Sequence, residues 1–275
     1  DIRVAFLDFL LIDDVTLNDG NAFYQYFCLW LTDELELDDR VEEYWQSPLT
    51  NPQRCTRYLD RYILPTLAQP LVLAMDEVDR IFDTPSSNDF FSMLRSWHNL
   101  RAMKKIWKQL DITLVTCIEP YQLIANLNQS PFNVCEVLEL NDFSLEQVHE
   151  LNLRHGSPLS VSEENQLMQL VNGNPYLVRR ALYLVSSQKL SASQLFSQAF
   201  SDTGPFGDHL KHHLFRIYDK PELVSALLQV IRSQRCPDEQ LFFRLRGAGL
   251  IRREGRKVLP RCQLYADYFR ERLDS

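Results

Sequence analysis

Glycine and long apolar runs are both scarce in this sequence. Only 8 of its 275 residues are glycine. No apolar stretch approaches the roughly 20 residues that a membrane-spanning helix requires, so we predict no membrane segment. The longest, from Val4 to Ile12, is interrupted by Asp8 and fits a buried strand better. A basic-then-apolar leader with a small-residue cleavage site is also missing, so we expect no secretory signal.

Paired cysteines are missing as well. The six cysteines are widely scattered, none forms a C-x-x-C pair, and none stands near a histidine at the spacing of zinc ligands. Several lie inside apolar stretches, as buried free thiols do. We therefore expect a reducing, cytoplasmic compartment.

Charge is unevenly distributed along the chain, whose net charge is -8. Residues 205–275 hold 14 Lys and Arg against 9 Asp and Glu, whereas residues 1–204 hold 15 against 28. A change of sign of this kind indicates a domain boundary and different partners for the two parts.

Short apolar runs alternate with amphipathic segments in the first half of the chain. The runs predict strands and the segments predict helices, in the order Ile2–Phe9 (strand), Asn21–Leu35 (helix), Pro52–Leu67 (helix), Leu71–Met75 (strand), Asn88–Leu110 (helix) and Ile112–Cys117 (strand). Parallel strands need helical crossovers of this length. We therefore predict an α/β fold with a parallel sheet that is covered on both faces by helices.

The strand signal stops after Phe143. Four short helices follow, and several of them open on serine caps. They are predicted at Ser144–Leu153, Ser162–Val171, Pro175–Ser186 and Ser191–Phe200. From Asp208 onward, three helices precede a basic hairpin, Gly249–Pro260, with Glu-Gly at its turn. Helices followed by such a hairpin are typical of a winged helix. We predict three domains: an NTPase-like core over residues 1–142, a helical lid over 143–204 and a winged-helix domain over 205–275.

Two adjacent carboxylates follow the central predicted strand. Asp76 and Glu77 come directly after the run Leu71–Met75, at the edge of a parallel sheet where ligands bind. This is the Walker B pattern, in which the aspartate holds Mg²⁺ through its water shell and the next carboxylate orients or deprotonates the attacking water. We assign magnesium to Asp76 and water to Glu77. The alternative is that the pair marks a helix amino end, where acidic side chains are favoured.

The next predicted strand ends on a polar side chain. Thr116 lies at the tip of the run that begins at Ile112, where nucleotide switches keep a sensor of the γ-phosphate. The alternative is that threonine stands there as a β-forming residue.

Four segments resemble the bacterial AAA-like domain proteins of the STAND class of P-loop ATPases. They are Asp76–Phe82, Asp89–His98, Asn128–Val134 and Gly173–Leu177. The resemblance implies a nucleotide-dependent switch that binds ATP or ADP with Mg²⁺ and couples binding to a rearrangement of domains. It also implies a fused effector or sensor domain or another protein partner, and it allows a homo-oligomer.

The last of these segments is similar to the GxP motif, which begins a lid helix near the adenine. The resemblance implies that Pro175 lies near the base and that Arg179 and Arg180 contact the phosphates. The alternative is that the two arginines are ordinary surface charges. No G-x-x-x-x-G-K-[ST] loop is present to cradle the β- and γ-phosphates. Either that loop precedes residue 1 in a longer protein, which we favour, or a degenerate relative has lost it, and ATP hydrolysis depends on which holds.

Basic residues gather around the predicted hairpin. Such a cluster can contact phosphates, which gives an alternative function, a non-enzymatic DNA-binding or scaffold module. The residues concerned are Arg252, Arg253, Arg256 and Lys257.

Three histidines, His209, His212 and His213, fall near one face of a predicted helix. No cysteine or carboxylate completes a ligand set at suitable spacing, so we expect a solvated helix surface rather than a metal site.

Overall fold

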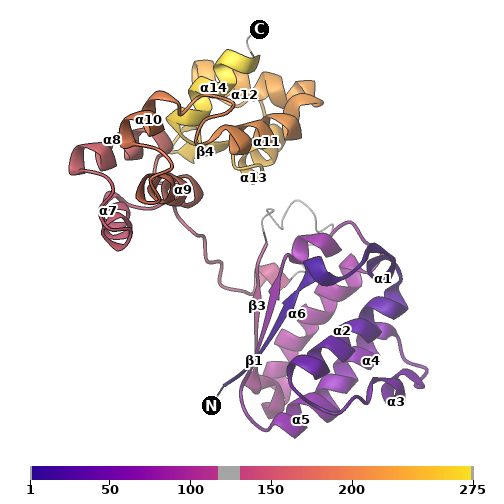
Figure 1. Cartoon of the computed structure of the whole chain (residues 1–275). Coiled ribbons are helices and arrows are strands. Elements are labelled where there is room, and N and C mark those ends of the chain that lie inside the picture. The colour runs from indigo at the N-terminus through magenta and orange to yellow at the C-terminus, as the bar shows by residue number, and fades with distance from the viewer. Residues whose placement is uncertain (1, 117–130, 274–275) are drawn as a thin grey trace. The chain divides into compact units, whose positions relative to one another are not determined.

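The computed structural model describes residues 2–116 and 131–273. The chain forms two compact units, Asp1–Leu138 and Glu139–Ser275, which we call unit 1 and unit 2. Figure 1 shows the sheet and its helices in unit 1 and the mainly helical unit 2. Each unit has its own buried apolar cluster and is described by itself.

A three-stranded parallel sheet forms the centre of unit 1. Its strands are β1 (Arg3–Asp8), β2 (Leu71–Asp76) and β3 (Leu110–Leu114), in the order β1-β2-β3. The register pairs Asp8 with Asp76 and Met75 with Leu114, so the three strands end at the same edge. The predicted parallel sheet is confirmed, and the first two predicted strands correspond to β1 and β2. β3 begins and ends earlier than the predicted Ile112–Cys117, and Cys117 lies outside the described residues.

Helices connect these strands and pack against one face of the sheet (Figure 1). Phe90 anchors the core, with its ring centre 5.4 Å from that of Phe23 and 5.5 Å from that of Phe27. Aromatic pairs of this kind contribute strongly to core stability. The helices of unit 1 are α1 (Asp14–Asn18), α2 (Gly20–Glu34), α3 (Val41–Trp45), α4 (Asn51–Tyr58), α5 (Leu64–Leu67) and α6 (Ser87–Met103), with a π-helical turn at Leu59–Ile63 and 3-10 turns at Phe9–Leu11, Val78–Ile81, Lys105–Gln109 and Pro131–Asn133.

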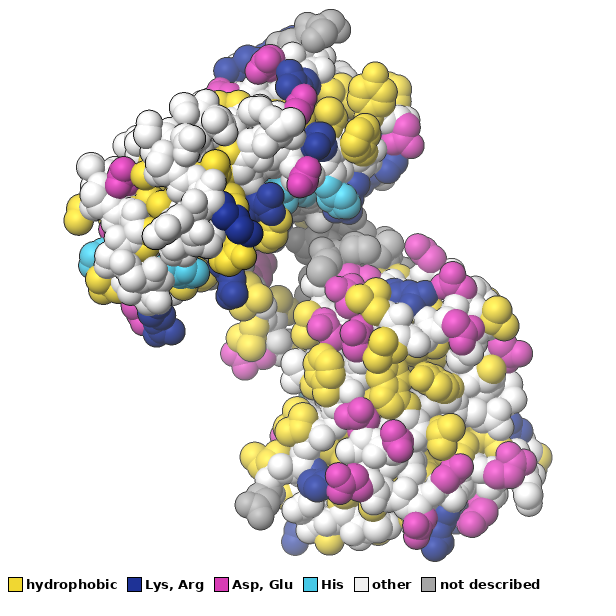
Figure 2. Space-filling view, in the orientation of Figure 1, with side chains coloured by type: hydrophobic (Ala, Val, Ile, Leu, Met, Phe, Trp, Pro, Cys, Tyr) yellow, Lys and Arg dark blue, Asp and Glu magenta, His cyan; other side chains and the backbone are white. Residues whose placement is uncertain are grey.

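The opposite face of the sheet is open. Along β1, Ala5 and Leu7 are fully buried, whereas Val4 is 56% and Phe6 50% exposed. Apolar side chains are visible on the surface of unit 1 in Figure 2. Parallel sheets are normally covered on both faces. Our expectation of two covered faces is therefore wrong for the residues that the structure describes, which cover one.

The helix predicted over Asn88–Leu110 is shorter in the structure. α6 ends at Met103, because Lys104 adopts an extended conformation with φ −129° and ψ 120°. The 3-10 turn that follows buries Trp107, whose indole N–H donates to Asp60 Oδ1 at 2.7 Å. This tertiary hydrogen bond holds the turn against the local helical periodicity, and Leu110 then opens β3.

Unit 2 combines helices with one β-hairpin. Ser144, Ser160 and Ser191 cap α7, α8 and α10 by accepting bonds from backbone N–H groups. The predicted starts at Ser144 and Ser191 are confirmed, whereas the helix predicted to open at Ser162 is capped by Ser160. The elements are α7 (Leu145–Arg154), α8 (Val161–Val171), α9 (Pro175–Ser186), α10 (Ala192–Ser197), α11 (Gly207–Tyr218), α12 (Pro221–Ser233), α13 (Glu239–Gly247), β4 (Ile251–Glu254), β5 (Lys257–Pro260) and α14 (Gln263–Leu273).

One buried cluster runs through unit 2, from Val148 in α7 to Phe269 in α14. The residues predicted as a lid and those predicted as a winged helix contribute to this same cluster, so their division at residues 204 and 205 stays a prediction. In the described ranges, no helix has both the length and the apolar character that crossing a bilayer requires.

Candidate functional site

Two aspartates stand side by side at the carboxyl edge of the sheet. Asp8 ends β1 and Asp76 ends β2, and the strand register pairs them directly. Asp76 Oδ1 accepts a hydrogen bond of 2.9 Å from the backbone N–H of Glu77, and Asp8 Oδ1 accepts one of 2.9 Å from Leu10. One oxygen of each carboxylate therefore shapes the turn that follows its strand. The sequence analysis missed Asp8, although it ends an apolar strand just as Asp76 does.

Glu77 occupies the left-handed region of backbone space, with φ 53° and ψ 35°. Residues other than glycine rarely adopt this conformation, and it clusters at functional sites where the surroundings hold it in place. Here the backbone N–H of Val78 donates to the carbonyl oxygen of Val115 at 3.4 Å, and that of Arg80 donates to the carbonyl oxygen of Glu77 at 3.2 Å. Hydrogen bonds within unit 1 therefore hold the backbone of this turn.

Thr116 lies at the same edge as the two carboxylates. The backbone N–H of Val115 donates to the carbonyl oxygen of Met75 at 2.9 Å, so the chain continues alongside β2 for one residue beyond Leu114. Thr116 follows next and is half-buried. The structure thus brings Asp76, Glu77 and Thr116 to one edge of unit 1.

Arg80 fixes the geometry of this edge. Its Nη1 donates to the carbonyl oxygens of Phe9 at 3.1 Å and Ile12 at 2.6 Å, and its Nη2 pairs with Asp14. The turn after β2 is thereby tied to the turn after β1. The sequence places Arg80 in a motif, but its cross-strand role depends on contacts between residues about 70 positions apart.

The other predicted site residues belong to unit 2. Pro175 is the first residue of α9, where Asn174 caps the helix by accepting from the N–H of Leu177 at 3.1 Å. Arg179 is exposed. Arg180 donates from Nε to the carbonyl oxygen of Pro205 and from Nη1 to the hydroxyl of Tyr176 at 3.4 Å. Arg180 is thus engaged inside unit 2, whereas Arg179 faces solvent.

Magnesium suits the donors at the carboxyl edge of unit 1. Carboxylate oxygens are hard ligands, and Mg²⁺ takes one or two of them together with waters and phosphate oxygens. In residues 2–116 and 131–273, no group of three or more His, Cys, Asp or Glu side chains is placed to hold a metal. A cation here would therefore depend on Asp76, water and a phosphate-bearing ligand rather than on a closed protein cage.

The basic cluster of unit 2 is largely paired. Arg252 bonds to Glu254, and Arg253 bonds to Glu239 at 2.8 Å and lies over the ring of Phe242. Arg256 and Lys257 are exposed and, within the part of the chain that the structure describes, form no ion pair. Two of the four predicted phosphate contacts are therefore available without breaking an existing pair. The hypothesis of a DNA-binding module is weakened accordingly.

The expectation of a solvated surface holds for His212, which is exposed, but is wrong for His209 and His213. His213 is 9% exposed, and the ring of His209 stacks on Tyr176 with centres 4.8 Å apart. The hydroxyl of Tyr265 contacts Nε2 of both histidines, at 2.5 and 3.3 Å. The rings join α9, α11 and α14, and this packing explains their burial.

A protein-family model for the AAA-like domain matches residues 1–271. The chain belongs to the AAA-like domain family. One segment that carried the resemblance, Asn128–Val134, lies partly outside the described residues, which resume at Pro131. In its described part, Phe132 packs against Phe91 with ring centres 5.6 Å apart.

Two comparisons place this AAA-like domain among known proteins. It is 30% identical over 147 residues to an uncharacterized WD repeat-containing protein of Synechocystis, a match covering 51% of this chain and 12% of that protein. Its fold is similar to that of a Walker-type ATPase of Pyrococcus abyssi, with a TM-score of 0.63 at 12% identity over 98% of this chain and 84% of that one. The chain thus has a P-loop-NTPase-like fold and spans a small part of its curated relative.

Proposed function

We propose that this AAA-like domain is a nucleotide-dependent switch of the STAND type, which binds ATP or ADP with Mg²⁺ and couples binding to a rearrangement of its domains. The observation that carries the proposal is the edge where Asp76, Glu77 and Thr116 gather. Membership of the AAA-like domain family and the fold shared with a Walker-type ATPase support it.

Each residue at this edge has a proposed role. Asp76 holds Mg²⁺ through a water, and the bound ion would neutralise charge on the phosphates. Glu77 orients the attacking water, and its backbone is held in the left-handed conformation by the turn after β2. Thr116 contacts the γ-phosphate. Asp8 is suited to a second water-mediated contact with the ion, because it is paired with Asp76 in the register.

Unit 2 contributes to nucleotide binding in the proposed switch. Pro175 packs near the base, and Arg179 and Arg180 are the proposed phosphate contacts. Arg179 is the more accessible of the two, because it is exposed and Arg180 already bonds to Pro205 and Tyr176. Through such contacts, the phosphates of the nucleotide would bias the arrangement of the domains.

The missing phosphate loop is proposed to come from another segment of a longer protein. Two features of the sheet support this. Within the described ranges, β3 has β2 on one side and no strand on the other, and the sheet face bearing Val4 and Phe6 is uncovered. An added strand with its loop and helix would pair the edge of β3 and cover this face.

The full-length protein is proposed to join this switch to a sensor or effector. The Synechocystis relative is described as WD repeat-containing, and the matched region is 12% of its length. WD repeats form propellers that suit protein recognition. On this view the protein is cytoplasmic, and a homo-oligomer would follow from nucleotide binding. The basic hairpin would then serve as an internal winged-helix module.

Calorimetry with Mg-ATP and Mg-ADP tests the proposal, on this chain and on the full-length protein. We expect binding by the full-length protein, loss of the magnesium-dependent part in Asp76→Asn, and retained binding without hydrolysis in Glu77→Gln. Asp83→Asn, at an exposed acidic residue of the loop after β2, is the matched control. Absence of ATP and ADP binding by the full-length protein would refute the switch.

A further inference from the structure

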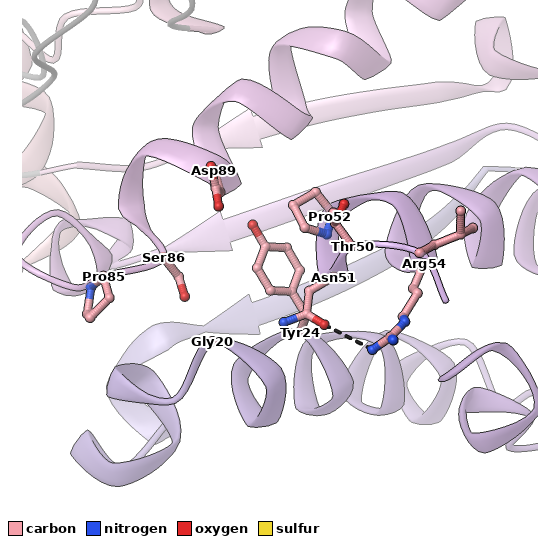
Figure 3. A pocket seen from close by; sticks show the side chains of 10 residues that line it. Gly20, Tyr24, Thr50, Asn51, Pro52, Arg54, Pro85, Ser86 and Asp89 are labelled. Atoms are coloured by element: carbon pink, nitrogen blue, oxygen red, sulfur yellow. Dashed lines mark hydrogen bonds between the residues drawn. The ribbon is translucent and has the colours of Figure 1, made fainter. Parts of the chain in front are cut away.

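A hollow of about 380 Å³ lies in unit 1 where three helices begin (Figure 3). The first turns of α2, α4 and α6 line it, and Asn51, Arg54, Ser86 and Asp89 supply polar groups. Helix amino ends carry partial positive charge and bind anions. Of the three, α2 is capped by Asp19 and α4 by Thr50 with Gln53, whereas α6 has no side-chain cap. None of the residues of the proposed nucleotide site lines this hollow, so it is a separate feature.

Tyr24 gives the hollow an unused hydrogen-bonding group. Its side chain is 2% exposed, and its hydroxyl has no hydrogen-bond partner in the part of the chain that the structure describes. Figure 3 shows the hydroxyl pointing into the space below Asp89. Burial raises the pKa of Tyr24 far above its usual range, so the hydroxyl keeps its proton and can donate. A buried hydroxyl without a partner costs free energy unless something binds it.

Ser86 supplies a second hydroxyl at the hollow. It precedes α6, is 4% exposed, and does not cap the helix with its side chain. A Cβ on Gly20 would stand 3.1 Å from Ser86 Oγ, so glycine at this position lets the start of α2 approach that hydroxyl. The two helix starts therefore converge on one oxygen that has not been used for capping.

Donors outnumber acceptors around the hollow. Arg54 brings a full positive charge, held in place by bonds from Nε to the carbonyl oxygen of Ser47 at 3.0 Å and from Nη1 to Asn51 Oδ1 at 3.2 Å. That second bond uses the amide oxygen of Asn51 and leaves its NH₂ group to donate. Asp89, exposed in the first turn of α6, is the one carboxylate among the lining residues. A fitting ligand therefore accepts several hydrogen bonds and donates one.

We propose that this hollow binds a protonated phosphate group, either inorganic phosphate or a phosphate monoester. The hydroxyls of Tyr24 and Ser86, the amide of Asn51 and the guanidinium of Arg54 donate to its oxygens. Asp89 accepts from the P–O–H. Sulfate has the same shape but carries no proton near neutral pH, so it meets Asp89 as an unrelieved like charge and is rejected.

Titration of the 275-residue chain with inorganic phosphate and with sulfate, by calorimetry, tests the site. We expect phosphate to bind at millimolar concentrations or below and sulfate to bind much more weakly. Tyr24→Phe and Ser86→Ala should each weaken phosphate binding by roughly tenfold to a hundredfold, the range for a lost hydrogen bond to a charged group. Tyr26→Phe, at an exposed tyrosine of the same helix that does not line the hollow, should leave binding unchanged.

Asp89→Asn should let sulfate bind about as well as phosphate, since an amide can donate where the carboxylate repels. Titration with glycerol phosphate distinguishes a phosphate monoester from inorganic phosphate as the ligand. A monoester binds as its monoanion and so weakens as the pH rises above about 6, whereas inorganic phosphate keeps a proton across neutral pH. Either pattern supports the protonated phosphate group.

Three results would overturn the proposal: no phosphate binding at millimolar concentrations, equal binding of sulfate to the unaltered chain, or unchanged binding in both Tyr24→Phe and Ser86→Ala. Folding does not confound the test. Phenylalanine keeps the ring that packs 5.3 Å from Phe23, and the hydroxyl it removes has no partner in the described chain. The unfolding transition of each variant, followed by tryptophan fluorescence, verifies this.

Discussion

Gly173 and Gly249 allow a matched test of how unit 2 holds the segment before α9. Both glycines have φ +72°, a conformation that side chains other than glycine's rarely adopt. They differ in their surroundings. A Cβ at Gly173 would stand 2.1 Å from the carbonyl oxygen of Phe143, whereas a Cβ at Gly249 meets nothing within 4 Å. Alanine at each position therefore separates backbone strain from steric overlap.

The expected magnitudes follow from these distances. Gly249→Ala should cost about 1 kcal/mol, the left-handed penalty alone. Gly173→Ala carries the same penalty and forces the Phe143 backbone away. That movement breaks the bond of 2.8 Å from the N–H of Phe143 to the carbonyl oxygen of Gly173, at about 1 kcal/mol, and adds about 1–3 kcal/mol of overpacking strain. We expect about 4 kcal/mol in all.

Urea unfolding can report each unit separately. All four tryptophans, at positions 30, 45, 97 and 107, lie in unit 1, so their fluorescence follows that unit. Far-UV circular dichroism follows both. In Gly173→Ala, the dichroism transition of unit 2 should move to lower urea while the tryptophan transition stays in place. A cost in Gly173→Ala within about 1 kcal/mol of that in Gly249→Ala would refute the steric reasoning.

Two further predictions concern one unit each. Arg80→Ala removes the hydrogen bonds from the guanidinium to backbone carbonyls of residues 9–12. Because hydrogen bonds to charged groups are the stronger ones, we expect the free energy of unfolding of unit 1 to fall by about 2–3 kcal/mol. A loss below about 0.5 kcal/mol in unfolding monitored by tryptophan fluorescence would contradict this role. In unit 2, burial, with nearby positive charge, lowers the pKa of His209 to about 4 and that of His213 to about 3. In the unfolded chain, these histidines take up protons near pH 6.5. The free energy of unfolding of unit 2 is therefore highest above that pH and falls as the pH drops toward the pKa values of the folded state. After allowance for solvent screening, we expect a loss of up to about 1 kcal/mol per pH unit for each histidine. Urea midpoints from circular dichroism between pH 7 and 5 measure this dependence of stability on pH. Replacing the exposed His212 with glutamine should preserve the dependence. A midpoint that does not change with pH would contradict the lowered pKa values of His209 and His213.

Much of the fold could be predicted because it is encoded locally. The helix predicted at Pro175–Ser186 matches α9 in both bounds, since asparagine and proline mark its start and apolar spacing marks its length. α1 and α3 were missed, because neither has more than five residues. Their stability comes from distant partners: Asp14 pairs with Arg80, and Trp45 donates to Asn21 Oδ1 at 3.0 Å. The spacing of apolar residues in the sequence does not predict such long-range contacts.

The hairpin shows the same limit at its turn. Sequence reasoning placed Glu-Gly there, whereas the register pairs Glu254 with Lys257 and leaves Gly255 and Arg256 in the loop. Gly255 has φ +57°, as two-residue hairpin turns require. A shift of one residue changes which face each basic side chain occupies. Pairing of Arg253 with Glu239 thus became visible only in three dimensions.

The candidate site, too, could be predicted only in part from the sequence. The pattern of an apolar run followed by Asp-Glu is enough to place Asp76 and Glu77 at a strand edge, because parallel strands end together. The pattern does not predict that Asp8 lies beside Asp76, because this depends on the strand register. It also does not predict the hollow at Tyr24, which is formed by three helix starts from distant segments. Both features arise from packing.

The contacts of Arg80 bear on where a switch would reside. This side chain ties the turn after β2 to the turn after β1, and Glu77 is held in its left-handed conformation by backbone bonds. Contacts within unit 1 therefore hold the backbone of the turn that carries Asp76 and Glu77. Arg179, by contrast, stands exposed on a separate unit. On the proposed function, the response to nucleotide would depend on exposed side chains such as Arg179 rather than on a change in the local shape of unit 1. Substitutions at Arg179 should then change the nucleotide response while leaving the stability of unit 1 intact.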